Sequence, residues 1–343
     1  MASTPLVQTP LSPYGADENG LVCGYRFVPG RPAQPLGSSA EALPLLAAGG
    51  PGFVWLHFNL SHTGAQPWLR RHGRLGENFF EAQADGSRST RIERDGDSLF
   101  AVINDVTFDF TFDASDVATL WVAVGETLVV TARRHPLRSV DRLRMAVKRG
   151  ETLASSVSLL DHLLRDQADE LQRIVRRATD RIDEIEDELL AGRHGHSTEL
   201  ARLRRLAVRL QRLLAPEPSA LARTLARPPA WVAADDLQHL HRAAEEFALV
   251  LRDIGALNER LKLMQDAEAT HVAEENNRSL FTLTMVTVLA LPINLIAGLL
   301  GMNVGGIPLA DAPHGFWVML AVIALMTGLI AWLALRRMRP PAE

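Results

Sequence analysis

The stretch that decides the fold is SLFTLTMVTVLALPINLIAGLL at positions 279–300, in which no residue is charged. A helix rises about 1.5 Å per residue, so about 22 residues span roughly 30 Å, the thickness of the bilayer hydrocarbon core. A second uncharged stretch, 315–335, follows after a short loop. This length and lack of charge favour membrane spans over buried core helices. We therefore expect a hairpin of two transmembrane helices near the C-terminus, at 279–303 and 315–335.

The charges that flank this hairpin predict its orientation. Arg278 precedes the first stretch, and arginines follow the second in the tail at 336–343. The connecting loop, 304–314, contains no Lys or Arg. Loops rich in Lys and Arg stay on the cytoplasmic side of a membrane. We therefore expect a multi-pass protein of the cell inner membrane with both termini in the cytoplasm.

The composition argues against several classes of protein. The chain has 343 residues and a net charge of −4, whereas nucleic-acid binders are usually basic. Its single cysteine, Cys23, allows neither an intrachain disulfide nor a site built from several thiolates. The sequence contains no phosphate-binding loop, no GxSxG and no HExxH motif. We expect no enzymatic activity, no cofactor and no nucleic-acid partner.

The region before the hairpin predicts an α+β cytoplasmic domain with long helices. Positions 1–19 lack the basic and apolar segments of a signal peptide, and we expect a disordered arm there. Runs of β-branched and aromatic residues predict strands between 20 and 135, with helices among them. The run WVAVGETLVVTARR, 121–134, predicts a β-hairpin with Gly125-Glu126 as its two-residue turn.

Two long helices are expected after this domain. The first runs from 136 to 191, with a break near Gly150. The second runs from 197 to 226, and Ser197 or Thr198 is the expected N-cap.

A third helix completes the helical region, 136–278, and continues beyond it. It begins near Ala233 and meets no strong helix breaker before Pro292, so we expect it to run unbroken into the membrane. A helix of roughly 65 residues, about 100 Å long, is rarely stable alone. Its expected neighbours are other copies of the chain, which predicts a symmetric oligomer.

A polar seam follows one face of the first membrane stretch. Its members recur at alternating steps of three and four residues, as in a left-handed helical bundle. They are Asn277, Leu280, Thr284, Thr287, Leu291, Asn294 and Gly298. An amide facing lipid is costly, so the seam should face protein or water. Two interpretations stay open: hydrogen bonds between packed helices, or the lining of a pore.

The tripeptide Gly301-Met302-Asn303 follows the seam directly. By itself it is typical of a helix C-terminus, where Gly and Asn readily adopt left-handed conformations. Its position is more specific, because it ends an uncharged span, precedes a short outer loop and lies one helix from the C-terminus.

Gly-Met-Asn in this position resembles the signature of the CorA superfamily of divalent-cation transporters. The wider string PINLIAGLLGMNVGGIPLADAPHGF, 292–316, is more similar to the ZntB zinc-transporter branch. The loop lacks the acidic Met-Pro-Glu-Leu-like segment that is usual in CorA magnesium transporters. The run WLHFNL at 55–60 and the hairpin at 121–134 fit the same family.

The resemblance implies a funnel-shaped homopentamer in which five copies of the first span surround a pore. Asn303 would form a ring of amide oxygens at the outer mouth, a neutral ligand that can receive a hydrated divalent cation. Gly301 would permit close approach of the backbones, and Met302 would pack the ring. Asn294 and Gly298 would line the next positions inward.

Three functional hypotheses follow. The first is a zinc transporter, for which the resemblance implies coupling to protons and for which cadmium, nickel, cobalt and magnesium are alternative ions. The second is a magnesium or cobalt channel of the CorA type. The third is a membrane-tethered sensor or scaffold that binds metal without conducting it. The glycine-rich loop favours the first over the second, and the seam with Gly-Met-Asn favours a transporter over a scaffold.

A candidate inner metal site lies just before the first span. His271 and Glu275 are separated by four residues and can bridge one metal ion on a helix. Asp266 lies eleven residues before Asn277, near the stripe of the polar seam, and could form an acidic ring in an oligomer.

Other histidines and acids are weaker candidates. His194 and His196 are either two zinc ligands or part of a solvated turn. His239 and His241 point about 200° apart on a helix and cannot share an ion within one chain. The acidic stretch 181–190 either concentrates cations or forms a solvated helix face laced with arginine.

Overall fold

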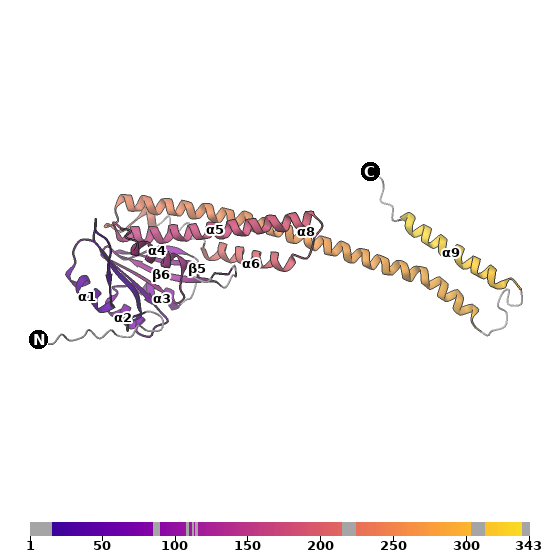
Figure 1. Cartoon of the computed structure of the whole chain (residues 1–343), viewed down its shortest axis with the longest axis horizontal. Helices are drawn as coiled ribbons and strands as arrows, with labels where there is room; N and C mark the ends of the chain where they lie inside the picture. Colours follow the sequence, from indigo (N-terminus) through magenta and orange to yellow (C-terminus); the bar gives the residue numbers. More distant parts are fainter. Residues whose placement is uncertain are drawn as a thin grey trace. The chain divides into compact units, whose positions relative to one another are not determined.

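A computed structural model of the chain describes residues 16–84, 90–107, 110–111, 113, 116–214, 224–302 and 313–337. The chain divides into two compact units, Met1–Gln265 and Asp266–Glu343. Figure 1 shows the elements of each unit.

The first unit is built on a mixed seven-stranded sheet with the order β2-β1-β3-β7-β6-β5-β4. Strands β3 and β7 pair in parallel, and the other neighbouring pairs are antiparallel. The strands are β1 Leu21–Phe27, β2 Gln34–Leu36, β3 Phe53–Asn59, β4 Arg91–Asp95, β5 Ser98–Val106, β6 Val117–Val124 and β7 Leu128–Arg133.

Helices cover both faces of this sheet. Successive side chains of a strand point to opposite faces, so the central strand β3 contributes Trp55 to one apolar cluster and Leu56 and Phe58 to the other. On the Leu56 face lie α1 Ser39–Ala48, α2 Ala65–His72 and α3 Glu77–Ala84. On the Trp55 face lie α4 Arg138–Lys148, α5 Ser156–Leu190, α6 Ser197–Leu214 and the part of α8 (Ala234–Leu300) that precedes Gln265. The result is a three-layer α/β/α arrangement, which refines the expected α+β class.

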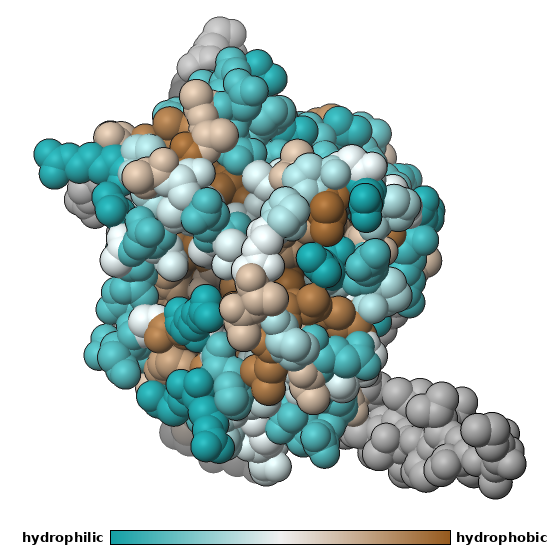
Figure 2. All heavy atoms as spheres, turned by 90° about the vertical axis from the view of Figure 1, so that its left-hand side faces the viewer, coloured by the Kyte–Doolittle hydropathy of each residue, from teal (hydrophilic) through white to brown (hydrophobic). Residues whose placement is uncertain are grey.

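The sheet end of the first unit, on the left in Figure 1, is hydrophilic over most of its surface. Figure 2 looks onto that end, where apolar residues form separate patches between polar ones. Such scattered apolar surface is normal for a water-exposed domain.

Residues 16–19, which the sequence assigns to a disordered arm, are part of the folded unit. The Asp17 carboxylate accepts hydrogen bonds from the backbone amides of Asn19 and Leu21 at 2.9 and 2.8 Å. It also accepts one from the amide of Ser39, at the start of α1, at 2.8 Å. Asp17 therefore joins the start of β1 to α1, which the local sequence does not reveal.

The β6–β7 hairpin forms as predicted, but its turn lies one residue later. The Gly125 amide donates to the Leu128 carbonyl at 2.9 Å, next to the Val124–Val129 pair. Gly125 and Leu128 therefore flank the turn, and the two-residue turn is Glu126-Thr127.

The helix predictions are largely confirmed. The break near Gly150 separates α4 from α5, and Gly150 takes φ +95°, a left-handed value that glycine tolerates. Helix α6 begins at Ser197, and its predicted continuation at 215–223 lies outside the described residues. Helix α8 is continuous through Pro292 to Leu300, as expected.

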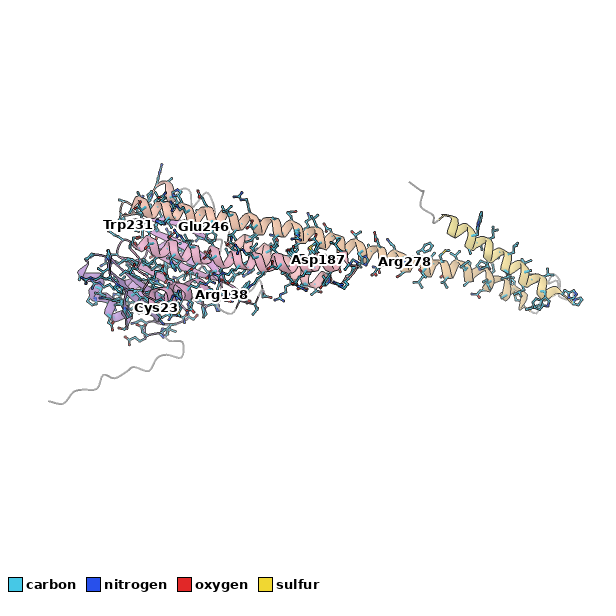
Figure 3. All side chains as sticks on the ribbon, turned by 45° about the horizontal axis from the view of Figure 1, so that its top comes forward. Cys23, Arg138, Asp187, Trp231, Glu246 and Arg278 are labelled. Carbon is cyan, nitrogen blue, oxygen red and sulfur yellow. The ribbon has the colours of Figure 1, made fainter. Side chains whose placement is uncertain are left out.

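Helix α8 packs on the first unit through a heptad stripe. Figure 1 shows α8 beside α5, and Figure 3 shows Glu246 on α8 near the sheet end of this layer, where Trp231 also lies. The buried apolar residues of α8 alternate at three- and four-residue steps: Leu240, Ala243, Phe247, Val250, Ile254, Leu257, Leu261 and Met264. This spacing keeps one face of the helix against α5 and α6.

Candidate functional site

Two helices in the second unit are long and apolar enough to cross a membrane. In α8, and in α9 (Gly315–Arg337), the most apolar stretch of 18 residues has a mean hydropathy of 2.1. The buried share of those stretches is 0% in α8 and 6% in α9. The core helix of a soluble protein would be mostly buried, so this exposed apolar surface calls for lipid or for further protein.

Within the second unit, the end of α8 lies near the start of α9, and the two helices diverge from there in Figure 1. The half-buried residues of the α8 span are Met285, Leu289, Ala290, Pro292 and Ile296. Those of α9 beyond its first residue include Met319, Ile323, Met326, Thr327 and Ile330. Apart from Ala290, both sets follow helical spacing, so each helix has one partly covered stripe.

The predicted polar seam lies on a different face of α8. All its residues are exposed in the single chain, including Leu280 at 61% and Leu291 at 64%. At about 100° per residue, the seam is centred about 150° from the half-buried stripe of Met285, Leu289, Pro292 and Ile296. The seam therefore faces away from α9, and no described part of the chain covers it.

The threonines of this helix use their hydroxyl protons within the helix. Thr284 Oγ1 donates to the Leu280 carbonyl at 2.8 Å, and Thr287 Oγ1 donates to the Leu283 carbonyl at 2.9 Å. Each hydroxyl oxygen keeps its lone pairs as an acceptor. The seam thus presents acceptor oxygens, which suit a cation or the water around it.

The Gly-Met-Asn tripeptide is described only in part. The Gly301 amide donates to the Ala297 carbonyl at 2.9 Å, which continues the helical bonding one residue past Leu300. Gly301 does not adopt a left-handed φ, so the left-handed capping interpretation fails at this residue. Met302 is half exposed, at 50%. Asn303 and the loop 304–312 lie outside the described residues.

The structure does not bring the three predicted inner-site residues together. His271 Nε2 lies 3.7 Å from Glu275 Oε1, in line with their spacing. Five residues of helix place His271 about 140° around the axis from Asp266. Among the described residues, no group of three or more His, Cys, Asp or Glu side chains is placed to hold a metal ion.

The weaker candidates have ordinary partners. His196 Nε2 lies 2.9 Å from Glu188 Oε2, so this histidine pairs with a carboxylate at the α5–α6 turn. His239 Nδ1 accepts from Arg165 at 2.9 Å, whereas His241 Nδ1 lies 2.8 Å from the Leu237 carbonyl. The two rings therefore contact different groups, as their helical spacing predicts.

The acidic stretch at 181–190 is laced with arginine, as the second interpretation held. Asp183 lies 2.6 Å from Arg260 of α8, which also pairs with Glu186. Arg181 pairs with Glu184 and Glu199, both at 2.6 Å. Figure 3 shows Asp187 towards the far end of α5 from the sheet.

Cys23 and His57 are neighbours across strands β1 and β3. Burial raises the pKa of the Cys23 thiol to about 12, so the thiol stays protonated at neutral pH. Burial, followed by the nearby charges of Arg133 and Arg144, lowers the pKa of His57 well below its usual value. Arg133 Nε donates to His57 Nε2 at 3.0 Å, so Nδ1 carries the proton toward Thr131 Oγ1 at 2.8 Å. The protonated Cys23 thiol is therefore not a nucleophile at neutral pH, and it does not form a metal site with His57.

A site that sequence reasoning missed lies between α4 and α5. His162 lies 3.2 Å from Asp166 and 3.2 Å from Glu151, beside a cavity of about 600 Å³. The His162–Asp166 spacing of four residues was a detectable signal. Glu151 lies in the preceding loop, and only the fold brings it to the imidazole.

Comparison with known proteins identifies the family. The family profile described as "CorA-like Mg2+ transporter protein" matches residues 50–337, most of the chain. The chain belongs to the CorA family. CorA-family proteins are ion transporters and not enzymes, which confirms the expectation that the chain is no enzyme. It also places the chain among divalent-cation transporters.

CorA-family relatives cover nearly the whole chain. The divalent cation transporter CmaX of Pseudomonas aeruginosa is 29% identical over 333 residues, covering 94% of this chain and 97% of CmaX. The solved structure of full-length CmaX has a TM-score of 0.76 at 27% identity, covering 94% of this chain and 98% of its own. The zinc transport protein ZntB of Pectobacterium carotovorum is 24% identical over 278 residues, covering 81% of this chain and 85% of ZntB.

The CorA magnesium transporter of Methanocaldococcus jannaschii shares the fold. Its structure has a TM-score of 0.70 at 19% identity, covering 90% of this chain and 96% of its own. The expected CorA superfamily membership is therefore confirmed, and both CmaX and ZntB are among the relatives.

Proposed function

We propose that this CorA-family chain transports zinc through a central pore formed by a homopentamer. The observation that carries the proposal is the exposed polar seam of α8, which faces away from α9. Five copies arranged around an axis would turn the seven seam residues toward one another. The threonine oxygens, the Asn277 and Asn294 amides and the leucine constrictions would then line the path.

The upstream part of α8 supports assembly. Opposite its buried stripe, the helix carries Leu249 and Leu263, which are 54% and 68% exposed. Each lies seven residues from Ala256, so the three residues lie on one face of the helix. Exposed leucines at heptad spacing favour contact with the same helix of another copy.

The choice of zinc rests on the relatives and the outer loop. ZntB is named a zinc transport protein, and CmaX is named a divalent cation transporter. The loop 304–314 contains one acid, Asp311, and is otherwise uncharged apart from His314. An amide ring at Asn303, next to Gly301 and Met302, would receive the hydrated ion without a ring of carboxylates. A magnesium or cobalt channel is the alternative within the family.

We also propose an orientation and a domain arrangement. Arg278 and the arginines of the tail 336–343 would lie in the cytoplasm of a cell with this protein in its inner membrane. The spans would be 279–303 and 315–335, with 304–314 outside. Residues 20–135 and the helices at 136–278 would form the cytoplasmic part of the funnel.

Uptake into proteoliposomes tests the function. The purified oligomer should carry Zn²⁺ faster than Mg²⁺, and a pH gradient should change the Zn²⁺ rate if transport is proton-coupled. Native mass spectrometry in detergent should show five chains. Faster Mg²⁺ uptake would favour the channel hypothesis, whereas metal binding without uptake would favour the sensor or scaffold.

A further inference from the structure

An imidazole with a carboxylate at each ring nitrogen lies between α4 and α5. His162 Nδ1 lies 3.2 Å from Glu151 Oε1, and His162 Nε2 lies 3.2 Å from Asp166 Oδ2. Both oxygens lie at ion-pair distance, and both attract the ring fully only when the imidazole carries its positive charge. The arrangement of the two carboxylates therefore suits the charged form of His162.

The two carboxylates belong to different segments. Asp166 lies one turn further along α5, so its bond to His162 stays within one helix. Glu151 lies in the loop that joins α4 to α5, so its ion pair with His162 holds that loop against α5. The charge of this ion pair is present only when His162 is protonated.

The same loop is attached to the start of α8. Ser155 is the N-cap of α5 and accepts from the Ser158 amide at 3.0 Å. Its hydroxyl donates at 2.8 Å to Asp236, in the first turn of α8. Loss of the Glu151 bond would loosen the segment that carries this cap, and with it the attachment of α8.

Charged groups of every neighbouring element surround His162. The wall from α4 contributes Arg138, Asp141 and Arg142, and Arg149 follows directly after that helix. From α5, Asp161 accepts from Arg165 at 3.0 Å, and Arg165 in turn donates to His239 of α8 at 2.9 Å. The side chain of His162 is 22% exposed beside the cavity of about 600 Å³, so protons reach it from solvent.

We propose that His162 is a proton-operated latch, which fixes the α4–α5 loop and the first turn of α8 when protonated and releases them when neutral. Its role in transport rests on the proposed function, but the latch itself does not. The hydrogen bond to Asp166, outweighing burial and aided by the charges of Asp166, Glu151 and Asp161, raises the pKa of His162. The latch is therefore closed below the usual histidine pKa of about 6.5 and opens as pH rises through the raised value.

Hydrogen–deuterium exchange of the intact oligomer in detergent tests the latch without any ion flux. Rates at about pH 6 and about pH 9, corrected for intrinsic exchange, should show peptides over 149–158 opening about two- to five-fold more at the higher pH. His162→Gln should show the open rate at both values. His241→Gln, which alters a histidine bonded to the Leu237 carbonyl of its own helix, should behave as wild type.

A second variant guards against misfolding. Glu151→Gln keeps the imidazole and the Asp166 bond but removes the charge that the loop supplies, so its pH difference should be at most half that of wild type. No pH difference in the wild-type loop would overturn the latch. So would a full pH difference in either His162→Gln or Glu151→Gln.

Discussion

Arg138 Nη1 donates a 2.6 Å hydrogen bond to Oε1 of Glu170, a carboxylate that is only 4% exposed. Arg142 pairs with the other oxygen of Glu170, and Arg173 lies 3.2 Å from that oxygen. Figure 3 labels Arg138 in the first unit, at the start of α4. Glu170 thus ties the first two turns of α4 to the middle of α5, next to the His162 cavity.

Glu170→Gln should destabilise the first unit by about 2 kcal/mol, because the buried carboxylate forms ion pairs with three arginines whose side chains are partly exposed. Thermal unfolding in detergent should show a loss of roughly 4–8 °C. Glu93→Gln is a matched control, since Glu93 forms a more exposed pair with Arg91 at 3.3 Å. That variant should shift the midpoint by less than about 2 °C, and equal shifts in both would refute the special role of Glu170.

The same carboxylate gives an acid-side pH dependence. Burial alone would raise the pKa of Glu170, but the Arg138 hydrogen bond and the charges of Arg142, Arg138 and Arg173 lower it. A lowered pKa means that the stabilisation is complete above the unfolded value of about 4.3 and is lost as pH falls through the folded value. The melting difference between wild type and Glu170→Gln should therefore be full at pH 6 and shrink below about pH 4. A difference that stays constant down to pH 3 would contradict this account.

His57 should weaken the fold at mildly acid pH. Its lowered pKa means that it binds a proton in the unfolded chain more readily than in the folded one. The stabilisation is therefore full above about pH 6.5 and falls by up to about 1.4 kcal/mol per pH unit below it. His57→Gln can keep the bonds to Arg133 and Thr131, and its melting temperature should fall less between pH 7 and pH 5. Parallel curves for the two proteins would exclude His57 as the source.

Sequence patterns predicted the elements whose cause is local. The uncharged stretches and the helix through Pro292 follow from length and composition. The β6–β7 turn was predicted one residue too early because a glycine favours a turn both within the turn and directly beside it, and Gly125 lies beside it. The parallel pairing of β3 with β7 joins segments about 70 residues apart, and no local signal reports it. The contacts of Asp17 with Ser39 and of Glu151 with His162 could not be predicted for the same reason, since these residues come together only in the folded chain.

The candidate site shows where proximity in sequence misleads. Asp266 was chosen for its spacing from Asn277 and His271 for its spacing from Glu275, yet the five residues between Asp266 and His271 turn a helix by about 140°. The seam residues do share one exposed face of α8, because they were chosen by the periodicity of a helix. Its role as pore lining stays a prediction, and so does the ring of Asn303.

Thr287 should be accessible from an aqueous pore, and Thr282 should not. Both hydroxyls donate to a backbone carbonyl of the preceding turn, at 2.9 Å in each case. Thr287 belongs to the seam, whereas Thr282 lies about 160° from the seam's centre. In a Cys23→Ser background, Thr287→Cys should react with a charged thiol reagent and lose most of its zinc flux. Thr282→Cys should stay unreactive, and equal labelling of the two would exclude the seam as the pore wall.

Asn303 should be required for transport but not for assembly. Its amide oxygen suits a hydrated cation, whereas Ala offers no ligand, so Asn303→Ala should abolish or strongly reduce zinc flux. Substitutions at exposed loop positions usually cost little stability, and size exclusion should show an intact oligomer. Asn303→Gly separates the two roles of this residue, because Gly ends a helix as well as Asn does. If the amide is the ligand, the Gly variant fails as badly as the Ala variant. Normal zinc flux through Asn303→Gly in liposomes would reduce Asn303 to a helix terminus and refute the selectivity ring.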